Sequence, residues 1–358
     1  MSLDKRLKKK FIKTITGPIS LIVIVLWVFL AIFAVVFSTD KTPMANRIEG
    51  NLALRPMGHH QLTYQLPNNQ EEISFLEQHF WGKPNNNRII PVANYSFGNQ
   101  QAMLSVYDRG EVNDTIFVSL NGMDTSTWKA NYFKTIYFPL GSDKLGRDML
   151  SQVLHGARVS ILVGFFSLLI ALFIGITLGL VAGYYGGLAD QIIQFFVSVL
   201  WTLPTFVLVL AFSVSLGKGL WQMMLAIGLC SWVDIARLVR GQVLSIKEKE
   251  YIQAAKILGF SNLRIMFIHI LPVLRGNILI VASANFAAAI LLEAGLSFLG
   301  MGVSPPTPSW GILIKENYTF ITFNKAYLAL IPGLSLASLV LSVNLLSNTM
   351  RDVFDERA

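Results

Sequence analysis

Long runs of apolar residues are the feature that most restricts the folds open to this chain of 358 residues. A helix needs about 20 such residues to cross ~30 Å of hydrocarbon, because each residue adds ~1.5 Å. The runs that approach this length are 17–37, 159–183, 192–216, 220–235, 278–300 and 326–346. Charged residues make up 14% of the chain, well below the roughly 25% of soluble domains. The sequence therefore predicts an all-α integral membrane protein with six transmembrane helices.

Basic residues near two of these runs indicate the orientation of the helices. The first run is preceded by Lys5, Arg6, Lys8, Lys9, Lys10 and Lys13. It is longer than the apolar core of a signal peptide and lacks a small-residue cleavage site, so we expect an uncleaved anchor. A second basic group comprises Arg237, Arg240, Lys247, Lys249, Lys256, Arg264 and Arg275. Because positively charged loops stay in the cytoplasm, we expect both groups and both termini on that side.

The chain lacks the sequence signatures of a catalytic or metal centre. Its single cysteine, Cys230, cannot form an internal disulfide. No Gly-x-x-x-x-Gly-Lys-Ser/Thr phosphate loop, Gly-x-Ser-x-Gly elbow or His-Glu-x-x-His motif occurs. His59, His60 and His79 fit no standard metal-ligand spacing. We therefore expect no catalytic residue, metal ion or cofactor on this chain, and no enzymatic activity of its own.

A polar segment, 38–138, follows the first apolar run and is expected on the extracytoplasmic side. Helical spacing of apolar residues predicts a helix over 69–80, and alternation predicts strands over 102–107 and 115–120. Turn-forming residues follow each strand. The segment is long enough to bury a core of its own, so we expect a small α+β insert. Its function does not follow from the sequence.

Small and acidic residues within the runs are candidates for helix packing or transport. Gly175, Gly179 and Gly183 recur every four residues on one helical face, where small residues let a second helix approach. Asp234 and Glu293 lie near the interior of other runs, and an intramembrane acid is costly enough to suggest a function. Glu293, the deeper of the two, is predicted either to line a translocation path or to pair with a polar group on an adjacent helix.

Segment 247–272 predicts a cytoplasmic helical hairpin. Good helix formers over 247–258 stop at Gly259, the residue that most readily adopts a left-handed helix end. Ser261 is suited to cap a second helix, which Pro272 is expected to terminate or kink. The residues alone leave two interpretations open, a docking element for a partner protein and a hairpin that lies in the membrane interface.

The same segment resembles the EAA loop of ATP-binding-cassette importer permeases. That loop reads Glu-Ala-Ala, three residues, Gly, nine residues, Ile, one residue, Leu-Pro. The corresponding residues here are Gln253, Ala254, Ala255, Gly259, Leu271 and Pro272. Gln253 replaces the Glu and cannot form its charge-assisted contact, and His269 replaces the Ile. The resemblance implies that these residues form the loop that couples the permease to an ATPase, with Ala254 and Ala255 leaving a shallow surface for the partner.

Four further segments resemble the dipeptide, oligopeptide and nickel branch of that family. They are 139–160, with Pro-Leu-Gly-Ser-Asp-Lys-Leu-Gly-Arg-Asp at its start, then 237–241, 296–311 and 344–352. With the hairpin they occur in the expected order, and the resemblance covers roughly 1–37 and 139–358. We therefore divide the chain into an N-terminal anchor, 1–37, the insert, 38–138, and a permease core, 139–358. The insert has no counterpart in the resemblance.

The resemblance implies a type I importer permease in the bacterial cytoplasmic (inner) membrane that moves di- or oligopeptides. Its implied partners are a second permease subunit, two ATP-binding-cassette ATPases and an extracytoplasmic solute-binding protein, with no nucleic acid. ATP and Mg²⁺ are expected in the ATPases. The choice among dipeptides, oligopeptides, nickel chelates and peptide antibiotics stays open, as does a homodimer or heterodimer of permeases.

Two other functions are compatible with the residues. A membrane-anchored sensor would use the insert as its ligand domain and the basic loop as its output. A secondary transporter would need coupling-ion sites, commonly built from several intramembrane charges or broken helices in paired halves, and the sequence offers few of either. Co-purification of an ATPase and a second permease would distinguish an importer from both.

Overall fold

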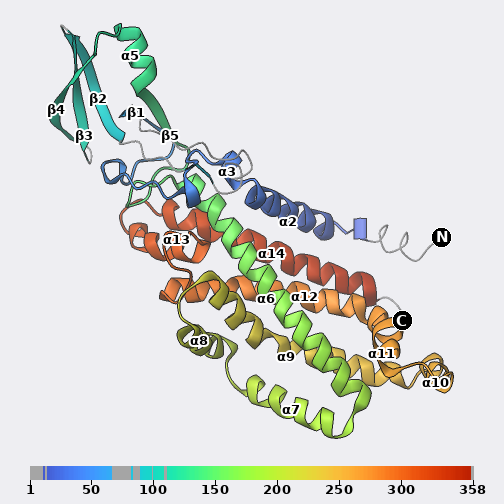
Figure 1. Cartoon of the computed structure of the whole chain (residues 1–358). Coiled ribbons are helices and arrows are strands. Elements are labelled where there is room, and N and C mark those ends of the chain that lie inside the picture. The colour runs from blue at the N-terminus through green and yellow to red at the C-terminus, as the bar shows by residue number, and fades with distance from the viewer. Residues whose placement is uncertain are drawn as a thin grey trace. The chain divides into compact units, whose positions relative to one another are not determined.

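The structure is a computed structural model that describes residues 11–12, 14–66, 82–83, 89–98, 100–108 and 111–355. The chain divides into two compact units, whose helices and strands are labelled in Figure 1. The first unit holds Met1–Val28, Val159–Ser304 and Gly333–Ala358, and the second holds Phe29–Arg158 and Pro305–Pro332. The predicted helix over 69–80, which includes His79, and the basic residues that precede the first apolar run lie outside the described residues.

Four described helices are long and apolar enough to cross a membrane. They are α6 (Met149–Tyr185), α9 (Leu220–Lys247), the continuous helix Asn262–Leu299 and α14 (Tyr327–Asp355). The run over 220–235 alone is short for a span, but α9 continues for 28 residues because its second half is amphipathic and buries one face. The first apolar run forms α2 (Thr16–Ile32), a shorter apolar helix, and α3 (Ala34–Phe37).

The predicted single helix over 192–216 is wrong. Two helices, α7 (Gly187–Thr202) and α8 (Thr205–Leu216), meet there at 96°. Leu203 is extended and Pro204 follows it, because a proline lacks an N–H group and disfavours helical backbone in the residue before it. The described residues therefore contain four spans, or five if the bent pair is one span, together with the shorter apolar helix α2.

The predicted glycine face packs one span tightly on another. A Cβ atom at Gly175, Gly179 or Gly183 of α6 would approach an atom of α9 to 2.7 Å, closer than real Cβ atoms come. At Gly179 that atom is the backbone oxygen of Ala236. The close helix packing expected from the four-residue spacing is confirmed.

Side-chain hydrogen bonds join further helices of this unit. The indole nitrogen of Trp27, on α2, donates to the hydroxyl of Ser338, on α14, at 2.9 Å. The hydroxyl of Ser347, also on α14, donates to the carbonyl of Ile280 at 3.0 Å. Ile280 belongs to α12 (Leu271–Leu299). Helices of this unit are thus joined by polar bonds as well as by apolar packing.

The second unit contains a five-stranded antiparallel sheet in the order β4-β3-β2-β1-β5. Its strands are β1 (His59–Gln65), β2 (Ile89–Gly98), β3 (Gln101–Asp108), β4 (Glu111–Ser119) and β5 (Phe133–Phe138). Helix α5 (Thr125–Tyr132) contributes Trp128 to a buried cluster with Tyr64 and Phe133. The predicted α+β insert is confirmed, and β3 and β4 contain most of the two predicted strands.

A buried turn precedes α6 in this unit. Arg147 forms an ion pair with Asp143 at 2.6 Å and a second with Glu316 of α13 (Trp310–Asn317). The carboxylate of Asp148 accepts the backbone N–H of Ser151 at 2.8 Å and so caps the start of α6. Burial raises the pKa of Asp148. The hydrogen bonds from Ser151 and Thr39 lower this pKa, but the effect of burial is larger. Segment 139–148 thus contacts α13, a helix that begins at the end of segment 296–311, and the resemblance singled out both regions.

Candidate functional site

The hairpin begins with a short helix that ends as its sequence predicts. Helix α10 spans Glu250–Ile257, and Gly259 follows with a φ of 77°. The N–H of Gly259 donates to Lys256 at 3.1 Å, and the N–H of Phe260 donates to Ala255 at 3.1 Å. These two bonds form a Schellman motif, which needs a left-handed residue at the position of Gly259. The hydroxyl of Ser261 then caps the next helix by accepting the N–H of Arg264.

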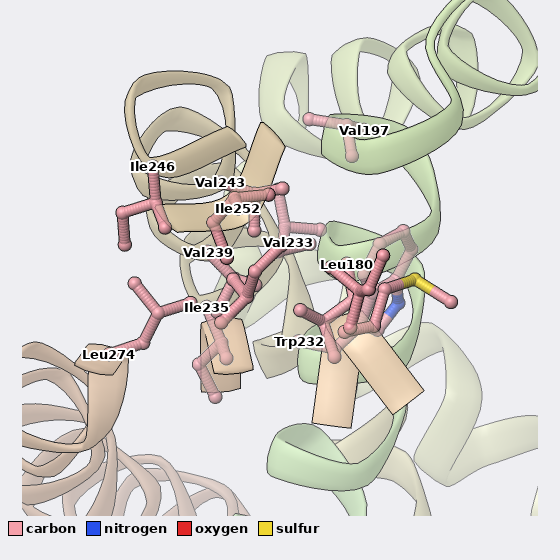
Figure 2. Packing of buried hydrophobic residues seen from close by; sticks show 14 of the residues in the cluster. Leu180, Val197, Trp232, Val233, Ile235, Val239, Val243, Ile246, Ile252 and Leu274 are labelled. Atoms are coloured by element: carbon pink, nitrogen blue, oxygen red, sulfur yellow. The ribbon is translucent and has the colours of Figure 1, made fainter. Parts of the chain in front are cut away.

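One face of α10 belongs to the core of the membrane helices. Ile252 and Ala255 are buried in one cluster with residues of α6, α7, α9 and α12. Figure 2 shows Ile252 in this cluster with Val239 and Val243 of α9 and Leu274 of α12. The expected shallow surface at Ala254 and Ala255 is therefore half correct, since Ala254 is exposed and Ala255 packs inward.

The opposite side of the hairpin presents apolar residues away from that core. Ile257 is 86% exposed, Leu258 is 71% exposed and Leu263, beyond the turn, is 63% exposed. Exposed apolar side chains that cluster on a turn mark a contact surface, because isolated ones are ordinary but grouped ones leave a patch in water. We call Ile257, Leu258 and Leu263 the apolar tip.

Polar contacts fix the rest of the hairpin against the membrane helices. The amide of Gln253 donates to the carbonyl of Lys247 at 3.2 Å and its side chain is exposed. The ammonium of Lys247 donates to the carbonyl of Gly183, at the end of α6, at 3.1 Å. Tyr184 donates to the side chain of Asn262 at 2.9 Å. Lys247, at the end of α9, and Asn262, in the second helix of the hairpin, therefore hold the hairpin to the end of α6.

The second helix of the hairpin does not end at Pro272. Leu271 and Pro272 begin α12, and a π-helical segment, Ile265–Ile270, precedes them in one continuous helix. A proline supplies no N–H for the preceding turn, and the wider π-helical turn accommodates that missing bond without a break. The hairpin thus continues directly into a span, which the sequence does not predict.

An ion pair that sequence analysis missed joins the broken span to α9. Two side-chain nitrogens of Arg240, Nε and Nη2, donate to the two carboxylate oxygens of Asp190 at 2.6 and 2.7 Å. This two-pronged geometry is the strongest form of such a pair. The signal in the sequence is weak, since the residues are far apart and Asp190 is next to the apolar run rather than inside it.

Glu293 is fully buried and bonded to two hydroxyls. It accepts from Ser160 of α6 at 2.9 Å and from Ser297 of α12 at 2.7 Å. Of the two alternatives for this residue, pairing with a polar group on an adjacent helix matches this geometry. A solute that reached its carboxylate would have to displace these bonds.

Asp234 instead lines an open pocket of about 440 Å³. The pocket lies beside the break between α7 and α8, where Trp201, Thr205 and Phe206 contribute to its wall. Asn285 of α12 adds a second polar group. The volume falls within the usual 300–1,000 Å³ of small-molecule pockets, with mostly apolar walls and few polar groups. Among the described residues no group of three or more His, Cys, Asp or Glu side chains could hold a metal ion.

Comparisons with known proteins agree with these features. The family model described as binding-protein-dependent transport system inner membrane component matches residues 175–358. The chain is 39% identical over 218 residues to the glutathione transport system permease protein of Pectobacterium atrosepticum, covering 61% of this chain and 72% of that one. It is 39% identical over 217 residues to a dipeptide transport system permease protein of Alkalihalophilus pseudofirmus, covering 61% and 71%.

Two further comparisons extend this set. The oligopeptide transport system permease protein of Bacillus subtilis is 35% identical over 217 residues, with 61% of this chain and 71% of that one covered. An inward-facing structure of the MetNI methionine ABC transporter aligns with a TM-score of 0.47 at 17% identity, covering 57% of this chain and 97% of that chain.

The matched region contains the glycine face, the bent pair, the hairpin and the spans that follow it. Proteins of this family are permease subunits of ABC importers in the inner membrane and are not catalytic enzymes. This chain belongs to the family of binding-protein-dependent transport system inner membrane components.

Proposed function

We propose that segment 247–272 docks this permease on an ATPase subunit and transmits its movement to the spans. The observation that carries the proposal is that one side of the hairpin is buried in the core of the spans and the other side is exposed. Ile252 and Ala255 share a core with α6, α9 and α12, whereas Ile257 and Leu258 face away from it. Because packed cores transmit displacement, a force on the apolar tip would move the spans with it.

The assembled importer contains this chain, a second permease subunit, two ATPase subunits and an extracytoplasmic solute-binding protein. ATP and Mg²⁺ bind in the ATPases, and this chain holds neither. Closure of the ATPases on ATP favours one of two states of the permease pair, open to the outside or to the cytoplasm. Docking changes that equilibrium only through its different free energy in the two states.

We assign the hairpin and both termini to the cytoplasm and the sheet insert to the opposite side. The basic residues of 237–275 support this orientation, because such residues stay on the cytoplasmic side. The corresponding division of the chain is an anchor, 1–37, the insert, 38–138, and the permease core, 139–358. Within the core, Gln253, Ala254, Gly259 and the apolar tip form the docking side.

The solute proposed for this importer is a di- or oligopeptide. Relatives at 35–39% identity are named for glutathione, dipeptide and oligopeptide transport. The pocket beside Asp234 supports this class, since a peptide carries an α-ammonium group that is protonated near neutral pH and suits a carboxylate. We therefore propose Asp234, rather than the buried Glu293, as the acid that meets the solute.

Gly259→Val tests the docking proposal. Its φ of 77° is left-handed, and a side chain there costs about 1–2 kcal/mol, more when β-branched. A Cβ atom at this position would meet nothing within 4 Å, so the cost comes from the backbone alone. We expect peptide uptake into proteoliposomes to fall about tenfold or more while the ATPase subunits still hydrolyse ATP.

Gly259→Asn is the matched control, because asparagine tolerates the left-handed region. It adds a side chain in the same open space and should retain most of the coupled uptake. Full coupled uptake in Gly259→Val would contradict a role for this turn in coupling.

Asp234→Asn tests the solute pocket. A hydrogen bond to a charged group contributes about 1.5–3 kcal/mol, so the amide should raise the half-saturating peptide concentration about 10- to 100-fold. The measurement is uptake of a dipeptide, with and without acetylation of its N-terminus. The unaltered permease and Asp234→Asn should transport the acetylated peptide equally poorly. If Asp234→Asn still transports the acetylated peptide less well than the unaltered permease does, contact between Asp234 and the ammonium group is excluded.

A further inference from the structure

A cationic cleft lies in the second unit, where the first apolar run meets the sheet insert. It has a volume of about 720 Å³ and is lined at one side by Val36, near the end of that run, and by Ser38 and Thr39, which follow it. Strand β5 lines another side with Lys134, Thr135, Ile136 and Tyr137. The family resemblance and the docking proposal leave this cleft without a role.

Among the described residues, four cationic side chains and one acidic side chain line the cleft. The cations are Lys41, Arg47, Lys83 and Lys134. None of the four has an ion pair within 4.0 Å in the part of the chain that the structure describes. Cations gathered without acidic partners repel one another, so they favour an anion between them.

The acid among the described lining residues, Asp40, already accepts hydrogen bonds from the backbone. Asp40 is 2% exposed, and its carboxylate accepts the N–H groups of Thr42 at 3.0 Å and Arg47 at 3.3 Å. Glu49 is near Arg47 but does not line the cleft, and burial raises its pKa. The exposed charge of the lining is therefore positive.

The chain limits the distance between the cleft and the end of the first apolar run. Lys41 is four residues beyond Phe37, the last residue of α3, and a fully extended chain of four residues spans at most ~14 Å. The headgroup region on each side of a bilayer is about 5–8 Å thick beyond the hydrocarbon. With the first apolar run placed in the membrane as an anchor, the cleft opens within or beside the layer that contains lipid phosphates.

An apolar surface adjoins the cationic one. Phe29, Phe33, Val36 and Phe37, at the end of the first run, are exposed. The rings of Phe33 and Phe37 both contact that of Phe29, with centroids 4.9 and 5.8 Å apart. A cationic cleft beside an apolar surface suits an amphiphile with a negative headgroup and apolar tails better than a free, fully hydrated anion.

We propose that this cleft binds the phosphate headgroup of an anionic phospholipid, with the acyl chains along the aromatic end of the first apolar run. Lysine and arginine near a membrane surface attract acidic lipids, and basic pockets beside spans hold their headgroups. The bound lipid anchors the insert at the membrane. This assignment is independent of docking at 247–272, so either can fail alone.

The double variant Lys41→Gln with Lys134→Gln tests the cleft without disturbing the sheet. The backbone carbonyl of Lys41 accepts the backbone N–H of Lys83, and that of Lys134 accepts the hydroxyl of Thr63. Substitution of the side chains leaves both carbonyls in place. Each basic residue near a membrane surface contributes about fivefold to acidic-lipid binding, so the double variant should bind about 30-fold more weakly.

The measurement is binding of fluorescent phosphatidylglycerol to the assembled, delipidated transporter in neutral detergent, with phosphatidylcholine as the zwitterionic comparison. Lys144→Gln is the matched control, since Lys144 is an exposed lysine of the same unit outside the cleft. It should leave phosphatidylglycerol binding unchanged. The double variant should bind phosphatidylcholine like the unaltered protein.

Three outcomes would overturn the proposal. One is equal phosphatidylglycerol affinity in the double variant and the unaltered protein. Another is displacement of the lipid by millimolar inorganic phosphate, which would identify a free anion as the occupant. The third is loss of solute-binding-protein association in the double variant with unchanged lipid binding, which would identify an acidic protein surface as the partner.

Discussion

Gly179→Leu is expected to prevent the stable folding of the membrane core. A Cβ atom at this position would be 2.7 Å from the backbone oxygen of Ala236 and 2.8 Å from the Cβ of Val239. A backbone oxygen cannot rotate away, so α6 and α9 would have to separate along the core that also holds α10. Overpacking of a tight core costs about 1–3 kcal/mol or more, and leucine adds three further carbons to the clash.

The expected result is a large loss of monodisperse protein after extraction and a fall in Tm of the remainder. Gly241→Leu is the matched control, because Gly241 lies on α9 itself and a Cβ atom there would meet nothing within 4 Å. It replaces a poor helix former with a good one and should stabilise α9 by up to about 1 kcal/mol. Equal Tm values for the two variants would contradict the packing of α6 on α9.

The spacing of residues was sufficient to predict features that depend on local sequence. Gly175, Gly179 and Gly183 recur at one helical face whatever surrounds them, and Gly259 ends a helix by its own backbone freedom. Both predictions needed only neighbouring residues. The resemblance of the hairpin to a coupling loop used the same local spacing.

The broken span shows where such reasoning fails. The average apolar composition of 192–216 predicts a span and takes no account of Pro204. A single proline can nevertheless end a helix when the residue before it is extended. The opposite holds at Pro272, where the helix continues because a π-helical segment precedes it. The choice between these outcomes depends on what packs around each proline and is not encoded locally.

The insert shows a second limit. Strands β3 and β4 follow one another closely and alternate apolar with polar residues, so the pattern predicts them. The pairing of β1 with β5 joins His59 to Phe138 across most of the insert. β1 is rich in polar residues and carries no strong strand signal of its own. Long-range pairing of this kind follows from the shared core around Tyr64 and Trp128 rather than from either segment alone.

The pair Ile257→Asp with Leu258→Asp is expected to abolish retention of the ATPase by this permease. Both side chains are largely exposed and belong to the outward side of the hairpin, so their replacement removes no core contact. Each buried contact at the centre of an interface contributes about 2 kcal/mol or more, so the pair should weaken docking about 10³-fold. The two carboxylates would also lose hydration on docking. The measurement is co-purification of the ATPase with the tagged permease.

Val112→Asp with Phe117→Asp provides the matched control. These residues are also exposed apolar side chains, 55% and 66% accessible, but they belong to the sheet insert. The same two charges introduced there should leave ATPase retention unchanged, because the insert faces away from the cytoplasm under the proposed orientation. If both double variants retain the ATPase, the apolar tip is not the docking surface. If both double variants lose the ATPase while their Tm values stay unchanged, added negative charge weakens the complex wherever it is introduced. That result contradicts the specific contact proposed for Ile257 and Leu258.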